Sequence, residues 1–278
     1  MGGGDFLSTA VNVASNPAVQ QTKQAYDTAS QDITPEQEYY IGRAVAANIL
    51  ATRKAYSEQA ATDYVNVLGR SLSLYSDRPE TFGGYHFLIM DSDEINAFAA
   101  PGGLILVSRG LLRCADSEET VAAILAHEIS HVVLKHGLNA ISKARWTAFW
   151  EAGGNAVVQV AGSPELQQLT GVFKDSINDI TNTLVNSGYS RAQELEADQM
   201  ALIIMRKAGY DPQAFEEMLT VMKSRLKPGG TDFAKTHPDP KVRIAAVEKT
   251  LAGKSAVTVA ASAESTRQAR YKAALGAI

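Results

Sequence analysis

Two histidines and a glutamate lie within five consecutive residues, His127-Glu128-Ile129-Ser130-His131. Residues four apart share one face of a helix, so His127 and His131 can bind one Zn²⁺ together. Glu128 is rotated about 100° from His127, which suits a base that contacts a water at the metal instead of the metal itself. The spacing predicts a catalytic zinc site of the type that hydrolyses peptide bonds.

The residues around this motif are typical of a buried helix. Asp116 is a candidate N-cap with Glu119 three residues later, and an apolar pattern runs from Val121 to Leu134. In the alternative interpretation, the histidines only satisfy hydrogen bonds in the core. Unpaired polar groups are costly inside an apolar helix, so we favour the metal site.

The third ligand is expected downstream. Glu194 and Asp198 are four apart and share a helical face, beside small residues that permit another helix to approach, Ser190, Ala197 and Ala201. We assign Glu194 to zinc and Asp198 to a hydrogen bond with the free N–H of a ligating histidine, His127. Glu196 points to the opposite side and is expected in solvent. An ordinary charged helix face is the alternative for this segment.

His136 is an alternative third ligand. His136 follows His131 by five residues, whereas the three-histidine zinc pattern places its third histidine six residues on, and Gly137 occupies that position here. We expect His136 to end the helix, with Gly137 at C′. His86 is expected on a strand, as a structural or surface histidine.

The remaining patterns predict a mostly helical α+β fold with a small β-sheet before the zinc helix. Thr34 should cap one helix, with Pro35 at N1 and Gln37 completing a capping box, and a second helix should span about 58–74. Strands are expected over 85–90, 96–99 and 104–108. When strands precede the metal-bearing helix, an edge strand can bind an extended peptide beside the metal by β-augmentation. The expected substrate-binding residues are Asn96, Ala97, Phe98 and Ala99.

An amphipathic helix is expected between the two metal-bearing helices, bounded by Gly162 and Gly188. Its apolar residues recur at spacings of three and four: Leu166, Leu169, Phe173, Ile177, Ile180 and Leu184. This helix could be a movable lid over the site or an ordinary core helix, and the sequence does not distinguish the two.

Composition limits the class of protein. With 278 residues, 45% of them apolar, and a net charge of −4, the chain can bury one sizeable core and has no nucleic-acid footprint. A single cysteine, Cys114, excludes an internal disulfide framework, so a metal site must use histidine and carboxylate. We expect a loose extension over 1–31, a metallopeptidase domain over 32–252 and an Ala-rich helical tail over 253–278.

The sequence also indicates whether the chain spans a membrane or is tethered to one. No apolar stretch approaches the roughly 18 residues of a membrane span, so the chain as given is expected to be soluble. The glycine run after Met1 suggests a chain cut just past a removed signal sequence of the lipoprotein kind, which would supply a membrane tether.

Together these motifs resemble a known family. The residues that carry the resemblance are the His127–His131 motif, Ser190-Arg191 with Glu194 and Asp198, Asn96 to Ala99, and Thr236-His237-Pro238 with Arg243. They are similar to the HtpX-like and CAAX-prenyl-endopeptidase family of zincin-like gluzincins, peptidase family M-48. The resemblance covers about residues 36–251 and is strongest to soluble bacterial envelope members, because the transmembrane helices of other branches are missing.

The resemblance implies one Zn²⁺ per chain, with His127, His131 and Glu194 as ligands and Glu128 as the catalytic base. It adds His237, which in relatives either stabilises the oxyanion or binds zinc as a latency plug. Asp198 keeps the supporting role assigned above, and Arg191 and Arg243 are expected either to donate to the oxyanion or to pair with the carboxylates that hold the site. Candidate oxyanion donors are, in order, His237, Arg191, Arg243 and Tyr189.

We therefore expect a zinc endopeptidase of the bacterial periplasm or cell envelope that acts on unfolded or misassembled polypeptides. One alternative is a chaperone-like interaction protein whose zinc-protease site is suppressed. A structural zinc module is disfavoured, because three protein ligands leave a fourth position open, as in catalytic sites.

Overall fold

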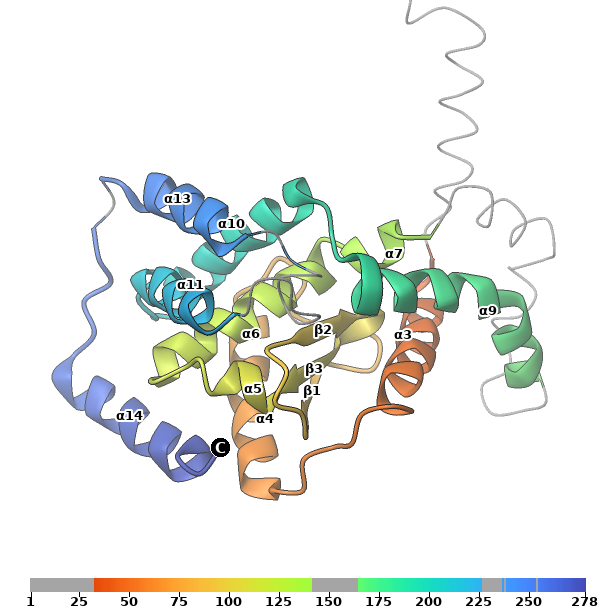
Figure 1. Cartoon of the computed structure of the whole chain (residues 1–278), viewed down its shortest axis with the longest axis horizontal. Coiled ribbons are helices and arrows are strands. Elements are labelled where there is room, and N and C mark those ends of the chain that lie inside the picture. Colours follow the sequence, from red (N-terminus) through yellow and green to blue (C-terminus); the bar gives the residue numbers. More distant parts are fainter. Residues whose placement is uncertain (1–32, 142–164, 227–236, 238, 254) are drawn as a thin grey trace, which may run out of the picture.

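The computed structural model describes residues 33–141, 165–226, 237, 239–253 and 255–278 (Figure 1). The expected extension over 1–31 lies outside the described residues, and so do Thr236 and Pro238. None of the described helices is long and apolar enough to cross a membrane.

Helices surround one small sheet. Two helices precede the strands, α3 (Pro35–Leu50) and α4 (Gln59–Ser73), and the strands are β1 (His86–Met90), β2 (Ala97–Ala100) and β3 (Leu104–Ser108), with a 3-10 turn at Pro101–Gly103. The later helices are α5 (Arg109–Leu112), α6 (Glu118–Val133), α7 (His136–Asn139), α9 (Glu165–Asn182), α10 (Arg191–Lys207), α11 (Gln213–Arg225), α13 (Pro240–Leu251) and α14 (Ala261–Leu275). The predicted fold class, mostly helical with a small sheet before the zinc helix, is confirmed.

Side-chain caps determine where the main helices begin. Thr34 caps α3 as predicted: the Gln37 N–H donates to Thr34 Oγ1 over 3.2 Å, and the Thr34 N–H donates to Gln37 Oε1 over 2.9 Å. The predicted cap of α6 was wrong by one residue. Ser117, not Asp116, is the N-cap, because its hydroxyl accepts the Thr120 N–H.

The sheet has the order β1-β3-β2, with β1 parallel and β2 antiparallel to the central strand β3. Its two faces contact different helices. Phe87, Ile105 and Val107 pack in the core that includes α4 and α6, whereas Phe98 and Leu106 pack in the core that includes α3 and α9. The sheet therefore lies between two helical layers, with β2 at one edge (Figure 1).

Helix α9, which lies between α6 and α10 in the sequence, belongs in part to the core. Ile177, Ile180 and Leu184 are buried with Ile41 and Val45 of α3. The helix continues through a π-helical turn at Thr183–Ser187 and ends at Gly188, whose φ is 72°. Its last turns therefore fit the core-helix alternative, while the side chains of Leu166, Leu169 and Phe173 lie outside the described part.

The C-terminal helix α14 packs against the start of the zinc helix. Arg270 of α14 binds the carboxylate of Glu118, the first residue of α6. Glu118 is fully buried and also accepts hydrogen bonds from Tyr210 Oη at 2.8 Å and Tyr64 Oη at 3.2 Å. The residues expected to form a tail are thus helical and joined to the core.

Candidate metal centre

Helices α6 and α10 bring the predicted metal ligands together. His127 and His131 lie on one face of α6, and α10 packs along this helix with Glu194 and Asp198 toward it. One donor atom from each of His127, His131, Glu194 and His237 lies within 4.8 Å of the others, and all four residues are buried. The cluster therefore contains the three predicted ligands and the histidine of the His-Pro segment.

The spacing of these donors fits a tetrahedral metal. Nε2 of His127 lies 3.1 Å from Nε2 of His131, and the Glu194 carboxylate lies 3.6 Å from the first and 3.5 Å from the second. Donors about 2.0–2.1 Å from zinc at tetrahedral angles are about 3.3 Å apart. Glu194 Oε1 is buried and has no hydrogen-bond partner among the described residues, as expected for an atom that faces a metal. The donor set therefore fits Zn²⁺.

A buried ion pair orients His127. Its Nδ1 lies 3.0 Å from Asp198 Oδ1, and Arg243 binds the same carboxylate with Nε at 2.9 Å and Nη2 at 2.6 Å. Burial alone would raise the pKa of Asp198, but the Arg243 guanidinium and the His127 N–H hold it below its usual range. An ionised Asp198 accepts the Nδ1–H of His127 and leaves Nε2 directed at the cluster.

The protonation of the cluster is uneven. Burial and the Arg243 charge would lower the pKa of His127, but hydrogen bonds with Asp198 and Glu194 raise it to about 9. Burial holds the pKa of His131 well below its usual range. Burial alone would raise the pKa of Glu194, but His237 and His127 hold it well below its usual range. Without a metal, His127 therefore carries the proton that a metal would displace.

His237 reaches the cluster from the segment before α13. Its Nδ1 lies 2.8 Å from Glu194 Oε2, and its ring centre is 5.7 Å from that of His127. The ring is buried. This position allows the two roles considered for it, a fourth metal ligand or a donor to a developing oxyanion.

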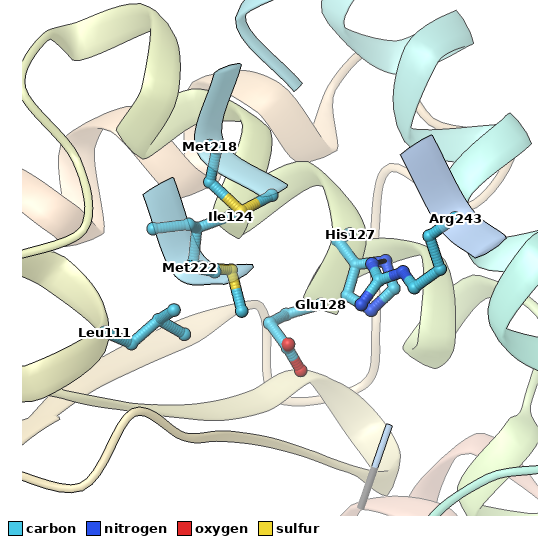
Figure 2. Close-up of a pocket in the computed structure, with 7 residues that line it drawn as sticks. All are labelled: Leu111, Ile124, His127, Glu128, Met218, Met222 and Arg243. Atoms are coloured by element: carbon cyan, nitrogen blue, oxygen red, sulfur yellow. Dashed lines mark hydrogen bonds between the residues drawn. The ribbon is translucent and has the colours of Figure 1, made fainter. Parts of the chain in front are cut away.

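Glu128 borders a small, mainly apolar pocket. Figure 2 shows its carboxylate beside His127, with the side chains of Leu111, Ile124, Met218 and Met222 forming the apolar part of the wall and Arg243 on the other side. Burial, together with the nearby Glu194 charge, raises the pKa of Glu128 to about 7. A carboxylate with such a pKa is suited to accept and return a proton near neutral pH.

Tyr189 stacks on the second histidine of the motif. Its ring lies 4.3 Å from that of His131 at an interplanar angle of 16°, and its hydroxyl is buried without a hydrogen-bond partner among the described residues. Burial and the Glu128 carboxylate hold its pKa well above the usual range, so the hydroxyl is a donor.

The structure does not bring Arg191 into the site. Arg191 is exposed at the first position of α10, and none of the hydrogen bonds or ion pairs among the described residues joins it to the cluster. The prediction overlooked that Ser190 is the N-cap of α10, which directs the next side chain outward. Glu196 is also at the surface, as expected, with 61% of its side chain exposed.

His136 differs from its prediction. The zinc helix ends at Val133, Lys135 adopts a left-handed φ of 55°, and His136 begins the short helix α7 instead of ending α6. Its Nδ1 lies 2.9 Å from Nδ1 of His131. A left-handed lysine has no reliable sequence signal, so this contact could not be predicted. His86 is exposed, as expected, and contacts the Gly83 carbonyl.

The predicted substrate segment forms the edge strand β2, which packs against α6. The Ser108 N–H donates to the Asn96 carbonyl, so the backbone groups of Asn96 point toward β3. Because this direction alternates along an antiparallel strand, the N–H and C=O groups of Ala97 and Ala99 point away from β3. Asn96 Oδ1 accepts the Ala97 N–H at 2.9 Å. Among the described residues, no hydrogen bond to the Ala99 N–H is recorded. The ladder with β3 therefore leaves the edge groups of Ala97 and Ala99 without a strand partner among the described residues, and both residues are buried.

Comparison with known proteins agrees with this geometry. The sequence profile of peptidase family M48 matches residues 59–251, which is more than half of the chain. The chain belongs to peptidase family M48. The match confirms the predicted resemblance and the metallopeptidase class, and it covers every described residue of the site.

Individual relatives match a similar region. The Beta-barrel assembly-enhancing protease of Escherichia coli is 27% identical over 224 residues, which cover 78% of this chain and 44% of that protein. The Mitochondrial metalloendopeptidase OMA1 of Arabidopsis thaliana is 32% identical over 162 residues, covering 57% of this chain and 30% of that protein. The chain thus spans less than half the length of these relatives.

Proposed function

We propose that this member of peptidase family M48 is a zinc-dependent endopeptidase with one zinc ion per chain. The observation that carries the proposal is the buried cluster of His127, His131 and Glu194 with the Glu128 carboxylate beside it. Two imidazoles and one carboxylate form a typical catalytic zinc set, which keeps one position for water or substrate.

When bound, zinc supplies Lewis-acid chemistry: it lowers the pKa of a water and polarises a carbonyl. Glu128 takes the proton of the attacking water and returns it to the nitrogen of the leaving amine. Asp198 and Arg243 hold His127 in the tautomer that presents Nε2. Because Arg191 is outside the site and Arg243 is bound to Asp198, Tyr189 and His237 are the better candidates to donate to the oxyanion.

We propose that the substrate binds as an extended strand along β2. The backbone groups of Ala97 and Ala99 point away from β3, and Asn96 would exchange its own hydrogen bond for one with the peptide. The Met-lined pocket beside Glu128 favours an apolar residue next to the scissile bond, since methionine side chains adapt to apolar groups. A backbone-based mode of binding requires an unfolded segment of substrate.

We propose that His237 is a plug on the fourth zinc position in the resting protein. Its place within the donor cluster supports this role, although it is also compatible with an oxyanion donor. The same observation favours the second candidate function, a chaperone-like protein whose protease site is suppressed.

The substrates we propose are unfolded or misassembled polypeptides of a bacterial envelope, by analogy with a relative named for beta-barrel assembly. A lipoprotein-type tether belongs to the same proposal.

The test is cleavage of reduced, unfolded protein and of a folded control by wild type and His237→Ala, after zinc removal and after zinc is restored. We expect zinc-dependent cleavage of the unfolded substrate only, faster in His237→Ala, with apolar residues beside the cut bonds in mass spectra. If His237 is an oxyanion donor, His237→Ala should instead lose activity on the order of a hundredfold with zinc retained. Zinc-independent cleavage would contradict the proposal.

A further inference from the structure

His136 contacts a proposed metal ligand on the side away from the cluster. Its Nδ1 lies 2.9 Å from Nδ1 of His131, and only 2% of His136 is exposed. At this distance one nitrogen must carry the hydrogen and the other must accept it. The two rings meet at 69° with centres 5.0 Å apart, so the contact is made edge to edge by the nitrogens and not by stacking.

The direction of this hydrogen bond follows from the cluster. Nε2 of His131 faces Nε2 of His127 at 3.1 Å and Glu194 Oε1 at 3.5 Å, so it must be free of hydrogen to bind a metal. His131 then carries its hydrogen on Nδ1 and donates it to Nδ1 of His136. The hydrogen of His136 is consequently on Nε2, which faces Glu196 Oε2 at 3.5 Å.

The backbone is shaped to make this contact. On a continuous helix, residues five apart are about 140° apart around the axis and cannot meet on one face. The chain leaves α6 at Leu134, and Lys135 takes a φ of 55°, the one positive φ of a non-glycine residue in the described part of the chain. This turn starts α7 at His136 and places its ring against His131. Left-handed conformations of such residues are uncommon and are retained where the surroundings demand them.

We propose that His136 is a positioning residue for the metal centre: it accepts the Nδ1–H of His131 and thereby fixes the tautomer and orientation of that ligand. His127 is oriented by Asp198 and Arg243, whereas His131 has only the Tyr189 ring and His136 as described partners on its outer side. The proposal rests on the proposed function in one respect, namely that His131 binds the metal.

The test compares zinc affinity, measured by competition with a chromogenic chelator, in His136→Phe and His136→Asn. Phenylalanine keeps the ring volume and removes the acceptor, so the dissociation constant for zinc should rise about ten- to a hundredfold. Asparagine places an acceptor where Nδ1 lies and should stay within a few-fold of wild type. His86→Phe, at an exposed histidine outside the site, is the matched control.

The melting temperatures of the zinc-free proteins show whether the substitutions disturb the fold, and His136→Leu repeats the test if the phenylalanine ring does not fit. Wild-type affinity in a folded variant without the acceptor would overturn the inference, as would equal losses in His136→Phe and His136→Asn. A wild-type protein that binds no zinc would instead overturn the proposed function.

Discussion

At the scale of single residues, the centre consists of polar groups that would be costly to bury alone. Asp198, Arg243 and His127 satisfy one another, and His237 hydrogen-bonds to Glu194. One carboxylate oxygen, Glu194 Oε1, stays without a hydrogen-bond partner among the described residues and lies 3.5 Å from Nε2 of His131, while Oε2 lies 3.6 Å from Nε2 of His127. A cation at this point would complete the set, which is why we consider the cluster a metal site and not a core network.

Removal of any proposed ligand should release zinc. Alanine at His127, His131 or Glu194 leaves two protein ligands beside His237, and we expect the zinc content of the purified protein to fall well below one per chain. Glu196→Ala is the control and should keep full content, since its carboxylate is at the surface. Elemental analysis measures this, and full zinc retention in Glu194→Ala would refute the third-ligand assignment.

Zinc uptake should also release a proton. The pKa of His127 is raised to about 9 in the metal-free centre, so at pH 7 its ring is protonated and Nε2 must lose a hydrogen before it binds metal. We expect about one proton released per zinc at pH 7, and an affinity that rises with pH until about 9. Calorimetry in buffers of different ionisation enthalpy measures the proton count. A count of zero at pH 7 would contradict this account.

The sequence predicted the residues of the centre where helical geometry alone was sufficient. His127 and His131 share a face because they are four apart, and so do Glu194 and Asp198. Their roles are still proposals. Arg191 was misplaced because its direction depends on a helix cap, and the contact of His136 depends on a left-handed turn at Lys135. The cap was a local signal that the prediction missed, whereas a left-handed lysine has no reliable signal in the local sequence.

At the scale of elements, the strand β2 connects the fold to its proposed substrate. It is the edge strand nearest the zinc helix in the described sheet, and its side chains are buried on both faces. Specificity on this strand can therefore come only from its backbone groups and from the neighbouring pocket. Natural edge strands are usually protected from pairing with other chains, and the residues of this one are buried.

Proline on the edge should weaken substrate binding. The Ala97 N–H does not take part in the ladder with β3, so Ala97→Pro removes an edge donor while the sheet is kept. We expect KM to rise, or turnover to be lost, with zinc content unchanged. Ala99→Pro removes the second edge donor and should act in the same direction. Unchanged kinetics in both variants would show that peptides bind elsewhere.

The C-terminal helix α14 stabilises the start of the zinc helix. Arg270→Ala removes the nearer of two cations from the fully buried Glu118, which keeps the hydroxyl groups of Tyr64 and Tyr210 and has Arg267 Nε 4.0 Å away. The unfolding free energy should fall by about 1–3 kcal/mol, the range for a buried group that loses a partner. Lys272→Ala, at an exposed position of the same helix, is the control. Equal denaturant midpoints for the two variants would contradict this role.

Sequence patterns located most elements but not their long-range partners. The cap at Thr34 and the strands were predicted, because capping residues and apolar alternation are local signals. Ser190 carries the same kind of local signal, and the prediction overlooked it. The sheet order with β3 in the centre and the pairing of Glu118 with Arg270, 152 residues apart, depend on tertiary packing. These features had no local signal to find.

At the scale of the whole molecule, the centre is built from parts far apart in the sequence. Helix α6 carries the proposed base and two of the proposed ligands, α10 carries Glu194 and Asp198, and the segment before α13 carries His237 (Figure 1). Because α14 also contacts α6, the described C-terminal helices surround the zinc helix on several sides. Removal of the segment before α13, or of α14, should therefore affect the centre as well as the stability of the fold.

Cleavage of casein by wild type and by Glu128→Gln, compared at equal zinc content, tests the central claim most directly. Glutamine keeps the size of the side chain but cannot accept the proton, so we expect wild type to cut internal bonds and the variant to be slower by about 10²–10⁴-fold. A chaperone-like protein would bind casein without cutting it in both forms. Equal rates in the two proteins, or no cleavage by wild type and His237→Ala alike, would contradict the assignment of this chain as a zinc endopeptidase.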